Sequence, residues 1–409
     1  MSKGIVVQKY GGTSVADVGR IQNVARRVVN TKKQGYDVVV VVSALGDTTD
    51  NLIELAHAIT KEPSEREMDM LVSTGEQVSS ALLAMATHKL GKDAISFTGA
   101  QVGIVTDSAF TKARIIDINA SRIVDALKKD KIVIVAGFQG VSANADITTL
   151  GRGGSNLTAV ALAKVLNAKV CEMYTDVEGV FTADPRVVKD ARKIDKISYE
   201  EMFELASLGA QILQPRSIEF AMKFNVPIHV RSSFSDKIGT IISREVKAME
   251  NIVVSGVAVN RNEAKVTICD VPDKPGLAAK IFKDIARANI NVDMIVQNVS
   301  RTKSTDVSFT VVASDIAKTI RVAKEIADGI GAGDVTIDKD IAKVSIVGIG
   351  MRSHSGVAAD MFEALAKKGI NIEMISTSEI KISCVVKKEH GEAAVKALHE
   401  KFRLGKKKR

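Results

Sequence analysis

The sequence of 409 residues has few aromatic side chains: it contains no tryptophan, and aromatic residues make up 4% of the chain. Proteins that bind nucleic acids often combine basic stretches with aromatic side chains on which bases stack. The net charge is +9, but no basic stretch has aromatic residues interleaved, and residues 406–409 supply four of the positive charges. We therefore expect a solvated basic end and no nucleic-acid partner.

Cysteine is also scarce. Cys171, Cys269 and Cys384 are scattered, and each lies in an apolar, strand-like stretch. Three isolated cysteines form no disulfide framework, and neither they nor the six histidines follow a metal-ligand spacing. We expect buried thiols, a cytoplasmic location and no metal site built from protein side chains.

Long hydrophobic runs are missing, which excludes a membrane-spanning helix from the expected elements. The longest apolar runs, at residues 37–45 (DVVVVVSAL) and 130–138 (DKIVIVAGF), fit fully buried strands of a parallel sheet. Met1 is followed almost at once by a strand at residues 4–8, so we expect no signal peptide and no membrane partner.

Strands and helices are predicted to alternate along the first 231 residues. The expected strands cover residues 4–9, 37–43, 94–97, 131–137, 169–174 and 226–231. The expected helices follow residue 13, run through roughly 49–90, and cover 117–128, the stretch after 156, 199–206 and 214–224. This order predicts an α/β sandwich with a largely parallel sheet, and the chain length predicts two or three domains.

A charged stretch at residues 243–251 (SREVKAMEN) breaks this alternation, and we expect a domain boundary there. Beyond it, residues 273–298 and 353–378 align without a gap at an offset of 80 residues. Each copy reads as a strand, a glycine-bearing loop, an amphipathic helix and a further strand. One such unit cannot bury its sheet alone, so the two copies should pair. The repeat is either a packing module or a small site for an anion or amino acid.

The first motif that indicates chemistry follows the first strand. Lys9 ends that strand, and Gly11 and Gly12 form a turn before Thr13 and Ser14 open a helix. Backbone N–H groups in a bare glycine turn can hold a phosphate while an ammonium group neutralises its charge. The order of residues is not that of a P-loop, and the other glycine turn does not fit G-x-G-x-x-G.

The second motif is TTLGRGGSN, at residues 148–156. Its first two residues suggest a turn, and Arg152 lies between glycines at a helix start. One interpretation is a tight turn with Ser155 or Asn156 as the helix N-cap. The other is an anion site in which the arginine binds a phosphate or carboxylate. Two glycine turns, each after a strand and each with a cation, favour a phosphoryl-transfer cleft at the carboxyl ends of the strands.

The motifs KYGGTSV, VVSALGDTTDNL, STGEQ, TLGRGGS and YTDVEGVFTADPR, in this order, resemble the aspartate kinase family of the amino-acid-kinase superfamily, and the repeat resembles ACT domains. The resemblance covers roughly residues 4–405. It implies a three-layer α/β/α sandwich with a mainly parallel sheet at residues 1–245, the catalytic domain. It further implies a regulatory region at 250–409 with two ACT-like (βαββαβ) domains, the first at about 265–335 and the second at about 336–409 with a strand from 250–264.

The resemblance implies transfer of the γ-phosphoryl group of Mg-ATP to the β-carboxylate of L-aspartate. The product, 4-phospho-L-aspartate, opens the biosynthesis of lysine (through diaminopimelate), threonine and methionine. The cofactors are ATP and Mg²⁺ bound through the nucleotide. Because a free β-carboxylate has a pKa of roughly 3.9, the nucleophile is already ionised and no general base is needed.

The resemblance also assigns roles to residues. Lys9 and Asn156 would be catalytic, and Thr48, Glu76 and Arg152 would bind aspartate, with Glu76 on the α-ammonium and Arg152 on a carboxylate. The expected nucleotide-binding residues are Lys9, Tyr10, Gly11, Gly12, Ser43, Gly153, Gly154, Ser155, Thr175, Asp176, Phe181 and Arg186.

The ACT-like repeats imply feedback control by lysine, threonine or both, although the sequence leaves open which amino acid binds where. The expected effector-binding residues are Asp273, Lys274, Gly276, Ala278, Asn291, Val292, Asp293, Gln297, Val357, Ala358, Asn371, Ile372, Ser378 and Glu379. Asp273 and Asp293 are suited to meet an α-ammonium group. We expect a homo-oligomer through ACT pairing, or an α2β2 assembly if Met249 is an internal start rather than an ordinary linker residue.

Two positions depart from the family pattern. Asn156 stands where the family usually has aspartate, and Gln211 stands where it commonly has lysine. One alternative is therefore an amino-acid sensor with a weakened kinase domain, and another is a kinase of a related amino acid such as glutamate. The presence of Lys9, Glu76 and Arg152 favours an active enzyme, and the paired repeats favour aspartate as the substrate.

Overall fold

The computed structural model describes residues 2–209, 212–244, 253–298 and 304–405. The chain divides into two compact units. Unit 1 comprises Met1–Phe181, Lys193–Ser207 and Gln211–Lys247, and unit 2 comprises Thr182–Arg192, Leu208–Ala210 and Ala248–Arg409. Four features of the sequence lie outside the described residues, wholly or in large part: Gln211, Met249, the boundary at 243–251 and the basic end at 406–409.

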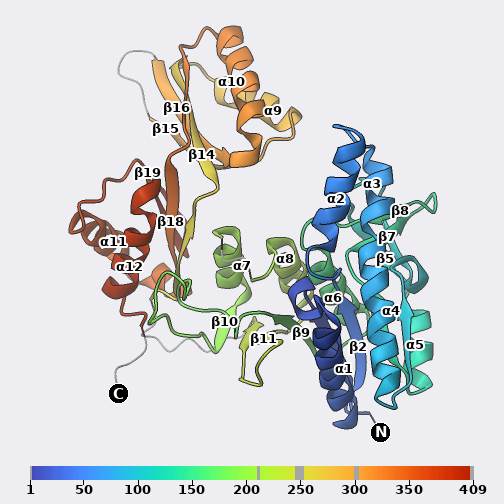
Figure 1. The fold of residues 1–409 in the computed structure, drawn as a ribbon. Helices are drawn as coiled ribbons and strands as arrows, with labels where there is room; N and C mark the ends of the chain where they lie inside the picture. Colours follow the sequence, from blue (N-terminus) through green and yellow to red (C-terminus); the bar gives the residue numbers. More distant parts are fainter. Residues whose placement is uncertain (1, 210–211, 245–252, 299–303, 406–409) are drawn as a thin grey trace. The chain divides into compact units, whose positions relative to one another are not determined.

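Unit 1 is built on an eight-stranded sheet with the strand order β10-β12-β11-β9-β1-β2-β6-β3 (Figure 1). The strands are β1 (Ile5–Tyr10), β2 (Asp37–Val42), β3 (Ala94–Phe97), β6 (Ile132–Ala136), β9 (Val170–Thr175), β10 (Lys196–Ser198), β11 (Ile228–Ser232) and β12 (Thr240–Ser243). Neighbours pair in parallel except for β11 and β12. The prediction of a mainly parallel sheet is confirmed, and the buried runs at 37–43 and 131–137 form β2 and β6, each of which pairs in parallel with both of its neighbours.

Helices cover both faces of this sheet. Val38, Val40 and Val42 share a core cluster with residues of α1 (Val18–Lys33) and α4 (Thr74–Lys89), which lie side by side in Figure 1. Since side chains alternate along a strand, the intervening valines point to the other face. There α6 (Gly154–Val165) packs on β1, β2 and β9, and α8 (Pro215–Phe224) packs on α6 and on α7 (Tyr199–Ser207). The result is the predicted α/β/α arrangement.

Smaller elements of unit 1 differ from the expectation. A four-stranded sheet has the order β5-β4-β7-β8. Its strands are β4 (Ile104–Thr106), β5 (Ile115–Ile118), β7 (Gln139–Ser142) and β8 (Ile147–Thr149). The helix expected at 117–128 is therefore wrong at its start, since α5 is Ser121–Lys128, and Thr148 and Thr149 belong to a strand, not to a turn. These strands of three or four residues carry little periodicity of their own, and they are stabilised by pairing with one another, β5 with β4, β4 with β7 and β7 with β8.

The long helical region expected at 49–90 is three helices. They are α2 (Thr48–Ile59), α3 (Glu65–Val72) and α4, and a short 3₁₀ helix, η1 (Gly12–Val15), precedes α1. The start of α4 lies against the loop after β2, where a Cβ on Gly75 would meet the Cβ of Ala44 at 2.7 Å. Glycine at position 75 is therefore what allows this helix to approach the end of the sheet.

Unit 2 contains two sheets with helices, as the repeat predicted. The first copy has the order βαββαβ: β14 (Glu263–Pro272), α9 (Leu277–Arg287), β15 (Val292–Gln297), β16 (Ser304–Val312), α10 (Ile316–Ile330) and β17 (Val335–Asp338). The second has β18 (Ile341–Val347), α11 (Val357–Ala366), β19 (Met374–Thr377), β20 (Lys381–Lys387) and α12 (Gly391–Lys401). Its fourth strand is β13 (Gly256–Asn260), which pairs with β18 as β17 pairs with β14. A segment that precedes both copies thus completes the second sheet.

The two copies interact through residues at equivalent positions. Glu263 and Lys343 are related by the offset of 80 residues, and their side chains form a buried ion pair at 2.5 Å. Lys343 also pairs with Asp293, and Glu373, which is the equivalent of Asp293, pairs with Lys265. This approximate two-fold symmetry means that Asp293 already has an ammonium partner within the chain.

One segment of the kinase-like sequence belongs to unit 2. This segment is Thr182–Arg192, and the residues that flank it in unit 1, Phe181 and Lys193, form an isolated β-bridge. The Thr182 hydroxyl donates to the carbonyl oxygen of Leu404 at 3.2 Å and lies 3.0 Å from Nε2 of the buried His399. Ala191 bridges to Gly405, and the N–H of Val257 donates to the Thr182 carbonyl. We refer to residues 182–192 as the strap.

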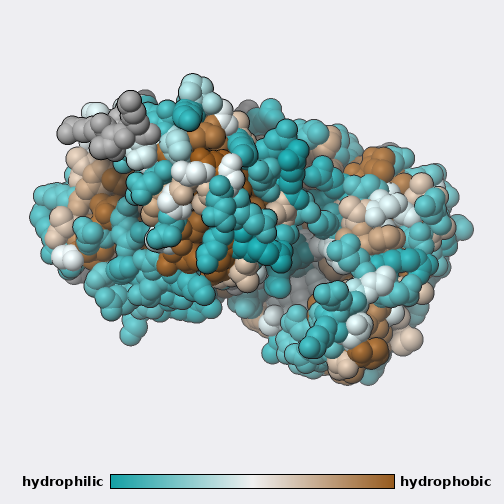
Figure 2. All heavy atoms as spheres, turned by 90° about the horizontal axis from the view of Figure 1, so that it is seen from above, coloured by the Kyte–Doolittle hydropathy of each residue, from teal (hydrophilic) through white to brown (hydrophobic). Residues whose placement is uncertain are grey.

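Most hydrophobic side chains are withdrawn into the interior. Figure 2 shows apolar residues in separate patches among hydrophilic ones on the face in view. Across the described ranges, no helix combines the length and apolar character that crossing a membrane requires. Cys171 and Cys384 are buried free thiols as expected, but Cys269 is only half-buried, because it lies where the register of β14 shifts against β16.

Candidate active site

A cavity of about 660 Å³ lies in unit 1 at the carboxyl ends of β1, β2 and β9. In a parallel sheet these ends carry the loops that bind ligands. The cavity brings together eleven of the residues expected from the sequence: Lys9, Gly12, Ser43, Glu76, Arg152, Gly153, Gly154, Ser155, Asn156, Thr175 and Asp176. Residues more than 160 positions apart in the chain therefore meet in one cavity.

Lys9 is the cation of the first glycine turn. Alternation along β1 places its side chain on one face of the sheet and those of Gln8 and Tyr10 on the other. Burial lowers the pKa of Lys9 to about 8. No carboxylate of the described residues forms an ion pair with its ammonium group, so the positive charge is uncompensated and suited to a phosphate.

The first glycine turn packs closely on the loop after β2. A Cβ on Gly12 would lie 3.0 Å from the Ala44 carbonyl oxygen and 3.1 Å from that of Gly46. The N–H of Gly46 donates to the Gly12 carbonyl at 3.2 Å. Glycine is therefore needed for the two loops to form one wall of the cavity.

The second glycine turn has a different helix cap from the one expected. Gly153 is the N-cap of α6, with φ +76°, and it makes no side-chain cap hydrogen bond, so the expected cap at Ser155 or Asn156 is wrong. A Cβ on Gly153 would lie 1.8 Å from Cγ of Gln214, which explains why only glycine fits. Ser155 and Asn156 instead lie in the first helical turn, where both side chains line the cavity.

Arg152 is exposed at the cavity, and the chain that carries it is held by two residues that the sequence did not indicate. The buried carboxylate of Asp69 on α3 accepts hydrogen bonds from the N–H groups of Thr111 and Thr149, at 2.9 and 2.8 Å, and from the Thr149 hydroxyl. Arg216 donates to the carbonyl oxygens of Leu150 and Ala113. An isolated aspartate or arginine on a helix gives no sequence signal for such a role.

Glu76 lies in the first turn of α4. Its Oε1 accepts a hydrogen bond from the N–H of Ala44 at 3.1 Å, while Oε2 is buried without a hydrogen-bond partner among the described residues. Burial raises the pKa of Glu76 to about 7. The unpaired oxygen at the cavity wall is suited to a ligand that brings a positive charge.

Five expected residues do not line the cavity. Tyr10 is buried and stacks on Tyr174, with ring centroids 4.6 Å apart, and the N–H of Gly11 donates to the Tyr174 carbonyl oxygen at 3.4 Å. The Thr48 hydroxyl donates to the Leu45 carbonyl, while its neighbours Thr49 and Asp50 line the cavity instead. Phe181 flanks the strap. The exposed Arg186 pairs with Asp184 within the strap.

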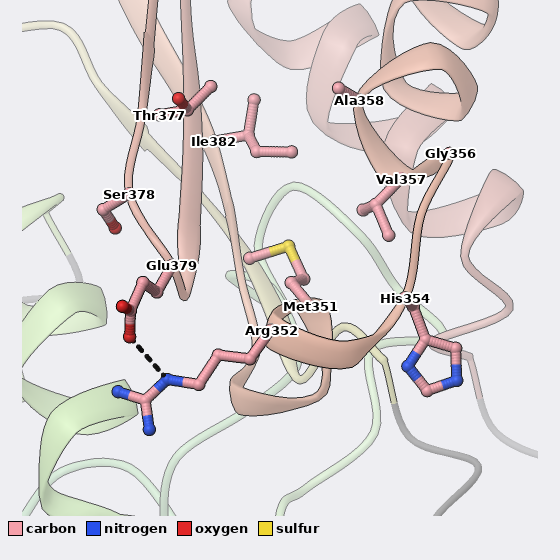
Figure 3. A pocket seen from close by; sticks show the side chains of 10 residues that line it. All are labelled: Met351, Arg352, His354, Gly356, Val357, Ala358, Thr377, Ser378, Glu379 and Ile382. Atoms are coloured by element: carbon pink, nitrogen blue, oxygen red, sulfur yellow. Dashed lines mark ion pairs between the residues drawn. The ribbon is translucent and has the colours of Figure 1, made fainter.

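A second cavity, of about 490 Å³, lies in unit 2 (Figure 3). It brings together four expected effector residues: Val357 and Ala358 at the start of α11, and Ser378 and Glu379 after β19. Arg352, which the sequence did not single out, forms an ion pair with Glu379 at 3.1 Å across the cavity.

The remaining expected effector residues do not line either cavity. They are Asp273, Lys274, Gly276, Ala278, Asn291, Val292, Asp293, Gln297, Asn371 and Ile372. Gly276 is the N-cap of α9 with φ +92°, as Gly356 is of α11 with φ +89°, so the two copies share a loop geometry. They differ in that the cavity described above belongs to the second copy.

Comparison with known families identifies one kinase-like part and two ACT-like parts of the chain. Residues 4–232 match the model of the amino acid kinase family. Residues 265–328 and 344–402 each match a model of the ACT domain.

Two curated relatives are similar over nearly the whole chain. The aspartokinase of Mycolicibacterium smegmatis is 53% identical, covering 98% of this chain and 96% of the relative. The aspartokinase of Pseudomonas aeruginosa is 55% identical over 98% of both chains.

Solved structures give the same result. E. coli aspartokinase III in complex with aspartate and ADP (R-state) is 28% identical, with a TM-score of 0.81 over 97% of this chain and 99% of that one. The same enzyme in complex with lysine and aspartate (T-state) is 27% identical, with a TM-score of 0.74 over the same shares.

Proposed function

The chain belongs to the aspartokinase family of amino-acid kinases and is an aspartate kinase, and we propose from this premise how its cavities act. The cavity of unit 1 transfers the γ-phosphoryl group of ATP to the β-carboxylate of L-aspartate, which yields 4-phospho-L-aspartate. The observation that carries this proposal is that one cavity brings together the Lys9 ammonium, which forms no ion pair among the described residues, and Oε2 of Glu76, which has no hydrogen-bond partner among them.

The residues of the cavity fit a nucleotide. Two glycine turns that a Cβ would fill lie beside the uncompensated charge of Lys9, and such turns accept polyphosphates closely. Lys9 neutralises the transferring group, Ser43 and the turns at Gly12 and Gly153 hold the phosphates, and Thr175 and Asp176 line the nucleotide. Mg²⁺ enters with ATP, bound by phosphate oxygens, and supplies further charge neutralisation.

Aspartate would be held by charge at both ends. The α-ammonium group meets Oε2 of Glu76, which removes an unpaired buried acceptor. The exposed guanidinium of Arg152 binds a carboxylate in a bidentate manner, which is why an arginine stands in a glycine turn. Thr48 holds the end of the loop after β2 through its bond to the Leu45 carbonyl.

The reaction needs positioning more than proton transfer. The attacking carboxylate is ionised near pH 7, so no residue has to act as a base. Asn156 is 7% exposed and lines the same cavity as Lys9. We assign its amide oxygen to orienting the Lys9 ammonium, a role that needs an acceptor and not a negative charge.

The second unit would regulate this reaction. The cavity at Val357, Ala358, Ser378 and Glu379 has the size of a site for an amino acid, and the related enzyme solved with lysine supports lysine as an effector. Threonine is the second candidate. Since the product leads to lysine, threonine and methionine, binding of an end product would reduce the flux into their synthesis.

ACT pairing would also assemble the enzyme. Within one chain the two copies already interact through ion pairs at equivalent positions. The same kind of pairing between chains would give a homo-oligomer, and an internal start at Met249 would give an α2β2 complex.

One assay tests the activity and separates the alternatives. The full-length chain is incubated with ATP, Mg²⁺ and L-aspartate, and hydroxylamine traps the acyl phosphate as a hydroxamate. Formation with aspartate and not with glutamate supports the proposal, whereas formation with glutamate alone indicates a kinase of a related acid. No hydroxamate with either, together with calorimetric binding of lysine or threonine, indicates an amino-acid sensor.

A further inference from the structure

A cavity of about 640 Å³ lies in unit 1 on the face of the sheet opposite Lys9. It lies between α1, which contributes Arg27, and the strands β9 and β11, which contribute Glu172 and Arg231. Alternation along β1 and β9 assigns Gln8, Tyr10, Glu172 and Tyr174 to this face. This face therefore carries a polar cluster where helix-covered parallel sheets usually have apolar side chains.

The cluster has buried nitrogen atoms without hydrogen-bond partners. Nε of Arg27, Nε of Arg231 and Nε2 of His229 are buried and have no partner among the described residues. The side chains of Arg27 and Arg231 are only 16% and 24% exposed. Because an unmade hydrogen bond on a buried donor is costly, these groups are suited to an acceptor from outside the chain.

The charges of the cluster do not balance. Glu172 is the carboxylate that pairs with Arg231, at 3.0 Å, and it also accepts hydrogen bonds from Gln8 and Tyr174. Arg27 donates to the Ser235 carbonyl oxygen at 3.1 Å and pairs with Asp236 at 3.0 Å, but the Asp236 side chain is 94% exposed, so water screens the pair. The cluster thus holds two partly buried guanidinium groups and one buried carboxylate, Glu172, which pairs with Arg231.

Two further basic side chains differ in what they add to the charge of the cavity. Lys169 also lines the cavity, so an ammonium group stands beside the two guanidinium groups. His229 adds no charge, because burial lowers its pKa, the neighbouring Arg231 lowers it further, and the ring stays neutral near pH 7.

We propose that this cavity is a second anion site of the enzyme, in which Arg27 and Arg231 bind the phosphate group of a small molecule. The two guanidiniums come from different elements and lie at 5.9 and 5.6 Å from the ring centre of Tyr174. Donors that converge from two directions suit a tetrahedral oxyanion, whereas a planar carboxylate is satisfied by a single guanidinium fork.

The experiment measures binding of inorganic phosphate to the full-length chain by titration calorimetry, against chloride at equal ionic strength. The Lys9→Ala background weakens phosphate binding by the catalytic cavity, so that the variants of Arg27 and Arg231 report on the second one. In this background we expect Arg27→Gln and Arg231→Gln each to weaken phosphate binding at least about tenfold. Arg26→Gln is the matched control, since it removes the same charge from the exposed neighbour on α1 and should leave the affinity unchanged.

Arg27→Gln leaves the Arg231–Glu172 pair intact, so it decides the matter if Arg231→Gln does not fold. Glycerol 3-phosphate is titrated in parallel: tighter binding than inorganic phosphate identifies a phosphate monoester as the ligand, and equal binding identifies free phosphate. The proposal is overturned if the Lys9→Ala chain binds no phosphate, or if Arg27→Gln and Arg26→Gln change the affinity alike. None of these readouts depends on kinase activity.

Discussion

The ammonium group of Lys9 must be protonated to neutralise a phosphate, and its pKa of about 8 places its titration close to physiological pH. A lowered lysine pKa means that the charged form is lost as the pH rises through it. We expect kcat/KM for ATP, which reports the free enzyme, to fall above about pH 8. In Lys9→Arg the guanidinium stays charged, so any remaining activity should lack this alkaline limb. An unchanged limb in that variant would assign it to another group.

Glu76 titrates from the other direction. Its pKa of about 7 is raised, so the carboxylate is protonated as the pH falls below 7 and loses its attraction for an α-ammonium. Glu76→Gln keeps an acceptor for the Ala44 N–H but removes the charge. We expect the KM for aspartate to rise about 10–100-fold, with the KM for ATP little changed. Steady-state kinetics with each substrate varied decide this, and an unaltered KM for aspartate would exclude Glu76 from the substrate site.

Asn156 allows a test of what the family's usual aspartate does. If this position only orients Lys9, Asn156→Asp should change kcat by no more than roughly tenfold in either direction. Asn156→Leu keeps the volume but removes the acceptor, so it should lower kcat considerably more. The hydroxamate assay measures both variants. If the unchanged chain forms no hydroxamate and Asn156→Asp raises its formation by orders of magnitude, the result supports the alternative of an amino-acid sensor with a weakened kinase domain.

At the scale of single elements, α3 holds the chain just before Arg152 through hydrogen bonds between Asp69 and Thr149. Asp69 accepts hydrogen bonds with both carboxylate oxygens, so Asp69→Asn turns one acceptor into a donor that faces the N–H groups of Thr111 and Thr149. We expect a loss of about 1–3 kcal/mol in the free energy of unfolding and a higher KM for aspartate. Glu65→Gln is the control, because it removes an exposed carboxylate from the same helix. Equal effects of the two changes in denaturant unfolding would contradict the anchoring role.

The elements that the sequence predicted are those whose own pattern decides their structure. The run at 37–43 is a strand because five consecutive valines are buried in β2, and the repeat revealed both sheets of unit 2. Short strands such as β8 escaped prediction because three residues carry little periodicity, and pairing with β7 stabilises this one. The cavity shows the same difference between predictable and unpredictable residues. The glycine turns and Lys9 belong to motifs that can be read from the sequence. Asp69 and Arg216 could not be predicted, because they contact segments that are distant in the sequence and meet only in the folded chain.

At the scale of the molecule, the strap is a segment of unit 2 that lies within the sequence of unit 1. Thr182→Val removes the hydroxyl that contacts His399, Leu404 and the N–H of Arg192 while it preserves the shape of the side chain. We expect faster hydrogen exchange across residues 182–192 and a loss of about 1–3 kcal/mol in stability. Thr182→Ser keeps the hydroxyl and should behave like the unchanged chain. Unaltered exchange in Thr182→Val would show that other contacts fix the strap.

The strap also bears on how the gene for this protein can be divided. A polypeptide that begins at Met249 contains both ACT domains but lacks Thr182–Arg192. In the full chain, Thr182 of this segment contacts His399 and Leu404. Such a product starts with an uncovered surface on the second ACT domain. The strap of a full-length copy fits this surface, so we expect the shorter product of an internal start to be more stable when the full-length product is present.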